Sequence, residues 1–122
     1  MIISKADATS LTDNFRDAGI TQISVPLAWR FDKIDIATLV NASDGFIRFY
    51  AGLKSVTGGG YEMTLLAVPT DSNQDGNDII SGTDPLIYDF AAPCPMVCDQ
   101  ANSPLLPAPG SPERKSQIFE RP

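Results

Sequence analysis

Prolines separate this sequence into a part that can build a packed core and a part that cannot. Six of the 10 prolines lie between residues 93 and 112. Because proline has a fixed φ and no backbone N–H, this stretch is denied helical hydrogen bonds and central sheet pairing and is left extended. We therefore predict an α+β body over residues 1–92, followed by a proline-rich C-terminal arm over residues 93–122.

The remaining composition is that of one globular domain. The chain has 122 residues, of which 43% are hydrophobic and 20% are charged, and this suffices for a single core. Its net charge of -6 repels phosphate backbones and anionic lipids. No segment approaches the ~20 apolar residues of a membrane span, and the sequence begins without a leader-like pattern. We expect neither nucleic acid nor a membrane as a partner, and a cytoplasmic location.

Two short helices and a small antiparallel sheet of three to four strands are expected in the body. Ser4 and Asp32 are suitable N-caps, because their side chains can accept hydrogen bonds from free backbone N–H groups. The glycines at 58–60 separate two strand-like runs and predict a hairpin, in which Arg48 and either Glu62 or Thr64 would face solvent. The predicted elements are helices over residues 5–18 and 33–41 and strands over residues 20–25, 46–53, 61–68 and 85–90.

The sequence contains no histidine. This removes the commonest general base, the commonest metal ligand and the usual partner of a serine or cysteine nucleophile. No pair of carboxylates stands in a recognisable catalytic motif. We therefore predict a protein that is not an enzyme.

An oxygen-rich segment suggests calcium as the one candidate cofactor. Asp71, Asn73 and Asp75, followed by Gly76, match the start of a calcium-binding loop. The match fails further along, and a calcium shell would have to be completed by Asp78 or Asp84. The alternative, which we favour, is that asparagine, aspartate and glycine build a tight connection between strands.

The two cysteines, Cys94 and Cys98, are separated by three residues rather than the two of a redox motif. Two thiolates fall short of a zinc site, so zinc would need ligands from a second chain. A local disulfide closes only a small loop, and a cytosolic compartment would keep it reduced. The simplest interpretation is a pair of thiols that packs the arm against the body.

Apolar residues are interleaved with the prolines of the arm. An extended, proline-stiffened segment loses little entropy on docking, so it can lay such side chains into grooves of its own body or of a neighbour. Our leading hypothesis is a structural or interaction protein that self-assembles into a homo-oligomer or filament through the arm. The expected docking residues are Met96, Val97, Leu105, Leu106, Ile118 and Phe119.

Four further stretches form a recognisable pattern: the helix start at 4–7, the strand at 47–53, the turn at 75–78, and the segment from Pro93 through Cys98 to Leu105. Together they resemble a group of small Bacteroidota proteins that share a Pro-Cys-Pro-x-x-Cys segment near the C-terminus. The group has no assigned activity, so the resemblance implies a shared architecture and no substrate. It also implies that the turn at 75–78 is a strand connection.

Overall fold

A computed structural model of the chain describes residues 2–19, 21–82, 85–89, 92–95 and 97–121. These residues form two α-helices, a mixed sheet and a separate pair of short strands, so the predicted α+β class is confirmed. The helices are α1 (Lys5–Asp17) and α2 (Lys33–Ala42). The strands are β1 (Thr21–Val25), β2 (Ala28–Trp29), β3 (Ile47–Ser55), β4 (Tyr61–Pro69), β5 (Tyr88–Asp89), β6 (Pro93–Cys94) and β7 (Gln117–Arg121).

Both helices begin where the capping residues predict. The Ser4 hydroxyl oxygen accepts a hydrogen bond from the Asp7 backbone N–H at 3.0 Å. Asp32 Oδ1 accepts one from the Ile34 N–H at 2.8 Å. These caps satisfy N–H groups that no helical carbonyl can reach.

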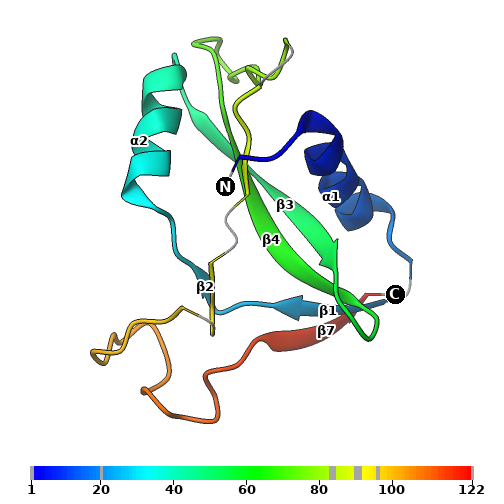
Figure 1. Cartoon of the computed structure of the whole chain (residues 1–122), viewed down its shortest axis with the longest axis vertical. Coiled ribbons are helices and arrows are strands. Elements are labelled where there is room, and N and C mark those ends of the chain that lie inside the picture. Colours follow the sequence, from blue (N-terminus) through cyan, green and yellow to red (C-terminus); the bar gives the residue numbers. More distant parts are fainter. Residues whose placement is uncertain (1, 20, 83–84, 90–91, 96, 122) are drawn as a thin grey trace.

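The β3–β4 hairpin lies at the centre of the molecule, with α1 on one side and α2 on the other (Figure 1). On one face Ala8 of α1 packs in a cluster with Leu66. On the opposite face Leu39 of α2 packs with Ala67. Since helices cover both faces, both alternating sets of β4 side chains are buried. Thr64 is only 2% exposed, and the prediction that it faces solvent is wrong.

The sheet differs from the predicted one in pairing and in size. Its strand order is β3-β4-β1-β7, and β5 pairs with β4. β1 runs parallel to β4, with Ile23 opposite Tyr61, so the sheet is mixed rather than antiparallel. A parallel neighbour requires a crossover, and the segment containing α2 and β3 supplies it. The two-stranded pair joins β2 to β6.

Regular structure continues into the arm, contrary to the expectation that it ends before residue 93. β7 pairs antiparallel with β1 along five residues, from Val25 opposite Gln117 to Thr21 opposite Arg121. It lies downstream of the proline-rich stretch, so its backbone N–H groups are free to pair. In the single chain, the end of the arm is therefore docked on the body at the rim of the sheet (Figure 1).

Candidate functional site

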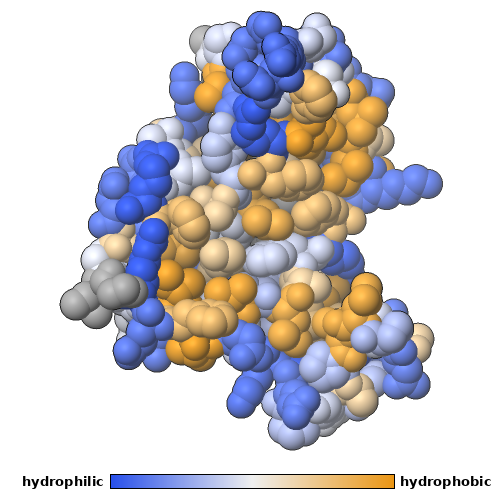
Figure 2. Space-filling model, turned by 180° about the vertical axis from the view of Figure 1, so that it is seen from behind, coloured by the Kyte–Doolittle hydropathy of each residue, from blue (hydrophilic) through white to orange (hydrophobic). Residues whose placement is uncertain are grey.

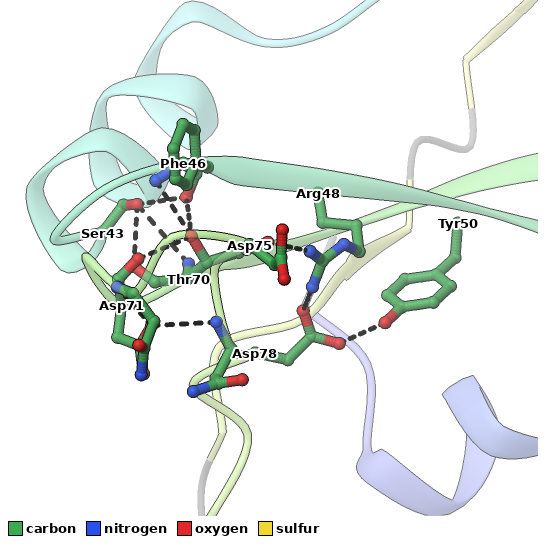
Figure 3. Close-up of polar contacts among 10 residues, drawn as sticks. Ser43, Phe46, Arg48, Tyr50, Thr70, Asp71, Asp75 and Asp78 are labelled. Atoms are coloured by element: carbon green, nitrogen blue, oxygen red, sulfur yellow. Dashed lines mark hydrogen bonds and ion pairs between the residues drawn. The ribbon is translucent and has the colours of Figure 1, made fainter.

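Three polar side chains meet where the connection after β4 folds back over β3. Arg48 Nη1 donates to Asp78 Oδ1 at 2.5 Å, and the Tyr50 hydroxyl donates to Asp78 Oδ2. Arg48 Nη2 also donates to the Asp75 carbonyl at 2.6 Å. Figure 3 shows the three side chains converging, two from β3 and one from the connection. The carboxylate thus fastens the connection to the sheet.

The protonation of Arg48 and Tyr50 suits a structural contact rather than proton transfer by either group. The hydrogen bond with Asp78 is the main cause of the raised pKa of Arg48. The pKa of Tyr50 is also raised, first by burial and then by its hydrogen bond to Asp78. Both groups hold their protons at neutral pH, so neither can accept one from a substrate.

The Asp71 carboxylate organises the start of the same connection. Its Oδ1 accepts hydrogen bonds from the backbone N–H groups of Asn73 at 3.0 Å and Asn77 at 2.9 Å. These bonds favour the ionised form and lower the pKa of Asp71. Gly76 closes the turn at φ +70°, and a Cβ at this position would point at the side chains of Thr70 and Phe46. This is the strand connection that the sequence favoured over a calcium loop.

The four predicted calcium ligands do not share a centre. Asp71 binds backbone N–H groups of its own loop, Asp78 binds a cation and a phenol, and Asn73 and Asp75 are exposed. Within the described ranges, no three His, Cys, Asp or Glu side chains are placed to hold a metal ion. Calcium binding stays a prediction, and calcium would have to displace Arg48 to use Asp78. Asp84 lies outside the described residues.

Sequence reasoning missed Thr70, which is fully buried beneath the connection. Its hydroxyl oxygen accepts from the Phe46 N–H at 2.9 Å, and its carbonyl accepts from the Asp44 N–H at 2.9 Å. The Ser43 hydroxyl reaches the same carbonyl at 3.2 Å. Thr70 therefore ties the end of α2, the start of β3 and the connection together (Figure 3). A threonine after a proline carries no sequence signal for such a role.

Cys94 and Cys98 are joined by a disulfide, with 4.9 Å between their Cα atoms. The predicted pair of reduced thiols is thus replaced by a bridge at the start of the arm. Cys94 is only 1% exposed and lies on β6 opposite Ala28. In this state neither sulfur is a thiolate, so a zinc site shared between chains would first require reduction.

The remaining predicted arm residues fall into two sets. Val97 and Leu106 are half-buried and line a hollow of about 380 Å³ beside Trp29. Ile118 and Phe119 lie on β7 and are 56% and 57% exposed, and Leu105 is 91% exposed. Met96 lies outside the described residues.

A second hollow, of about 250 Å³, lies between α1 and the sheet. Its lining includes the core residues Leu66, Val68 and Ile87, and its polar residues include Lys5 and Tyr50. It borders the Arg48–Asp78–Tyr50 trio through Tyr50 and Asp78. The sequence did not predict this space, because its walls come from elements far apart along the chain.

Comparison with known proteins gives no match to a family model, to a curated protein or to a solved structure. The resemblance to the Bacteroidota group therefore stays a prediction. Neither helix in the described part of the chain is long and apolar enough to cross a membrane.

Proposed function

We propose that this protein is a non-enzymatic structural protein that self-assembles into a homo-oligomer through its C-terminal arm. The supporting observation is the position of β7, which terminates the strand order of the sheet. An edge strand presents unpaired N–H and C=O groups along its outer side and can template a further strand. On β7 this edge is accompanied by two large apolar side chains, Ile118 and Phe119, that are more than half exposed. Figure 2 shows that apolar side chains reach the surface on the side of the molecule hidden in Figure 1.

The opposite edge of the sheet is less suited to pairing. At β3, the Asn14 side-chain amide of α1 donates to the Leu53 carbonyl at 3.0 Å. Arg48 and Tyr50 on the same strand are held by Asp78. Side chains over an edge interfere with an approaching strand. β7 is therefore the better candidate for assembly.

The sequence of β7 supports antiparallel pairing with the same strand of a second copy. If the two-fold axis stands perpendicular to the sheet at position 119, Phe119 of each copy lies opposite Phe119 of the other. One aromatic pair then forms on one face of the joined sheet, and such a pair contributes roughly 0.2–1 kcal/mol. Ile118 lies opposite Glu120 on the other face in this register. The contact is self-complementary and closes as a dimer, and a filament would need an additional surface.

Mass in solution tests this proposal directly. The full chain should be dimeric by light scattering, and the double variant Ile118→Lys/Phe119→Lys should be monomeric, because charged side chains block edge pairing. Val56→Lys is the matched control, since Val56 is 39% exposed and follows β3 rather than lying on β7. A parent that stays monomeric across the accessible concentration range would falsify the proposal.

Cross-linking tests the register. A mixture of the Ile118→Cys and Glu120→Cys variants should form a mixed disulfide faster than either variant forms a disulfide with itself. If Ile118→Cys alone cross-links as fast as the mixture, the two-fold axis lies elsewhere on β7 and the proposed register is wrong. Cross-linking no faster than that of Val56→Cys would remove the β7 contact altogether.

The proposed cytoplasmic location bears on the disulfide. Structural disulfides persist in oxidising compartments and are rare in the cytosol, so this location requires Cys94 and Cys98 to be reduced in cells. Alkylation of the protein at lysis, followed by mass measurement, decides the matter. Two alkylated cysteines support the cytoplasm, and none argues for an oxidising compartment.

A further inference from the structure

The hollow between α1 and the sheet combines an apolar floor with a polar mouth. A space of about 250 Å³ is lined by Leu66, Val68 and Ile87, which are each under 5% exposed and form its floor, and by the half-buried Ile80. Protein interiors are normally packed without gaps of this size. The space is open to solvent along α1, where Lys5, Thr12 and other polar residues border it.

The threonines of the helical wall offer no free hydroxyl proton to a ligand. Thr9 Oγ1 donates to the Lys5 carbonyl at 2.8 Å, and Thr12 Oγ1 donates within the helix to the Thr9 carbonyl at 3.1 Å and to the Ala8 carbonyl at 3.2 Å. The helical wall between the two basic residues is therefore largely a surface of methyl groups and oxygen lone pairs. Such a wall suits an apolar chain rather than a polar, hydrogen-bonding ring system.

Charge at the mouth is positive in a chain whose net charge is -6. Both basic residues of α1, Lys5 and Arg16, border the space, and of the described residues that line it Asp78 alone is acidic. Asp78 is already neutralised by Arg48, and Arg16 is paired with Asp13. Among the described residues, no hydrogen bond or ion pair is assigned to the Lys5 ammonium. The mouth therefore offers one unpaired cation.

We propose that this hollow binds a small amphipathic carboxylate, with its hydrocarbon chain on Leu66, Val68 and Ile87 and its acid group at Lys5. A water molecule takes up about 30 Å³, so the hollow has room for about eight groups of that size. A medium-chain fatty acid such as octanoate matches this volume. The site is independent of β7 and of self-assembly.

Methyl-resolved NMR titration with octanoate tests the site. Saturable shifts are expected at the methyl groups of Leu66, Val68 and Ile87, with small or no shifts at Ile118 of β7. Octyltrimethylammonium, which has the same chain length and the opposite charge, should bind at least several-fold more weakly. Equal binding of the two probes, or octanoate shifts absent from the three floor residues, overturns the proposal.

Two variants test separately how the Lys5 charge and the apolar space contribute to octanoate binding. Lys5→Gln should weaken octanoate binding about two- to five-fold, the range expected for a solvent-exposed ion pair, while Lys115→Gln on the exposed arm should leave it unchanged. Val68→Phe should fill the hollow and abolish binding. Because Val68 lies in the core, the amide spectrum of β3 and β4 checks that the Val68→Phe variant is folded. If Val68→Phe unfolds, the octanoate affinity of Lys5→Gln decides the test. An unchanged octanoate affinity in Lys5→Gln contradicts the proposed orientation.

Discussion

The guanidinium of Arg121 lies over the ring of Phe15, with 5.0 Å between its central carbon and the ring centroid. This contact fastens β7 to α1, two elements at opposite ends of the described chain. Nη1 of Arg121 is buried without a hydrogen-bond partner among the described residues, and the ring of Phe15 lies against the same guanidinium.

Replacing Arg121 by Gln should loosen β7 while leaving the hairpin intact. A cation over an aromatic ring contributes about 0.5–1 kcal/mol at a partly exposed site. Hydrogen exchange should therefore accelerate about two- to five-fold at the amides of β7 and little at those of β4. Arg121→Lys should recover part of the protection, and equal acceleration in both strands would contradict a local role.

Gly76→Ala should destabilise the fold more than Gly59→Ala. Both glycines have positive φ, +70° and +100°, so both substitutions carry the same kind of backbone strain. At Gly76 a Cβ would also lie 2.8 Å from Thr70 Oγ1 and 3.0 Å from Phe46 Cδ2, whereas nothing lies within 4 Å at Gly59. Overpacking of this kind costs about 1–3 kcal/mol. Urea unfolding of the two variants measures the difference, and equal midpoints would refute the close packing.

Asp71→Asn should remove a stabilisation that depends on pH. Backbone N–H groups hold the pKa of Asp71 below its ordinary value in the fold. A carboxyl with a depressed pKa contributes stability above its unfolded pKa of about 3.9, and this is lost as pH falls through the folded pKa. The gap in melting temperature between parent and variant should thus be constant near neutrality and close in acid. A gap that is unchanged below pH ~3 would contradict this account.

Lys54→Met should be costly because it removes the ion-pair partner of a buried carboxylate. Asp89 is 2% exposed, accepts a hydrogen bond from the Thr64 hydroxyl at 2.7 Å and forms an ion pair with Lys54. Loss of the partner of a buried charge is strongly destabilising, and the 32% exposure of the Lys54 side chain moderates the cost to about 2 kcal/mol. Lys115→Met, a change on the exposed arm, serves as the control in chemical unfolding and should be near neutral.

Reduction of the Cys94–Cys98 bridge should have a modest effect. The bridge joins residues four positions apart and so closes a short ring, for which chain entropy gives about 2 kcal/mol. Dithiothreitol should lower the melting temperature of the parent but not that of Cys94→Ala/Cys98→Ala. No change on confirmed reduction would mean that the ring is equally ordered without the bond.

The helices and the hairpin were predictable because their signals are local. Ser4 and Asp32 cap the next residues along the chain, and the glycines at 58–60 separate two strand-forming runs. The burial of Thr64 was not predictable from alternation, since alternation identifies two faces but not whether a helix covers each. That cover depends on α1 docking across the sheet.

The contacts between distant segments, in the fold and in the site, could not be predicted because they have no local sequence signal. The parallel pairing of β1 with β4, and the pairing of β7 with β1, join segments without any turn between them. In the site, Asp71 and Asp78 were recognised as loop residues. Their oxygen pattern, however, cannot reveal that Arg48 and Tyr50, about thirty positions upstream, would occupy Asp78.

The pairing of β7 with β1 also means that β1 is synthesised well before its partner strand. At ribosomal rates of about 5–20 residues per second, roughly 5–20 s separate the emergence of β1 from that of its distant partner. Throughout that interval one side of β1 is open to strands of other nascent polypeptides. Polysomes, where many copies are made close together, are where unintended pairing would be most frequent.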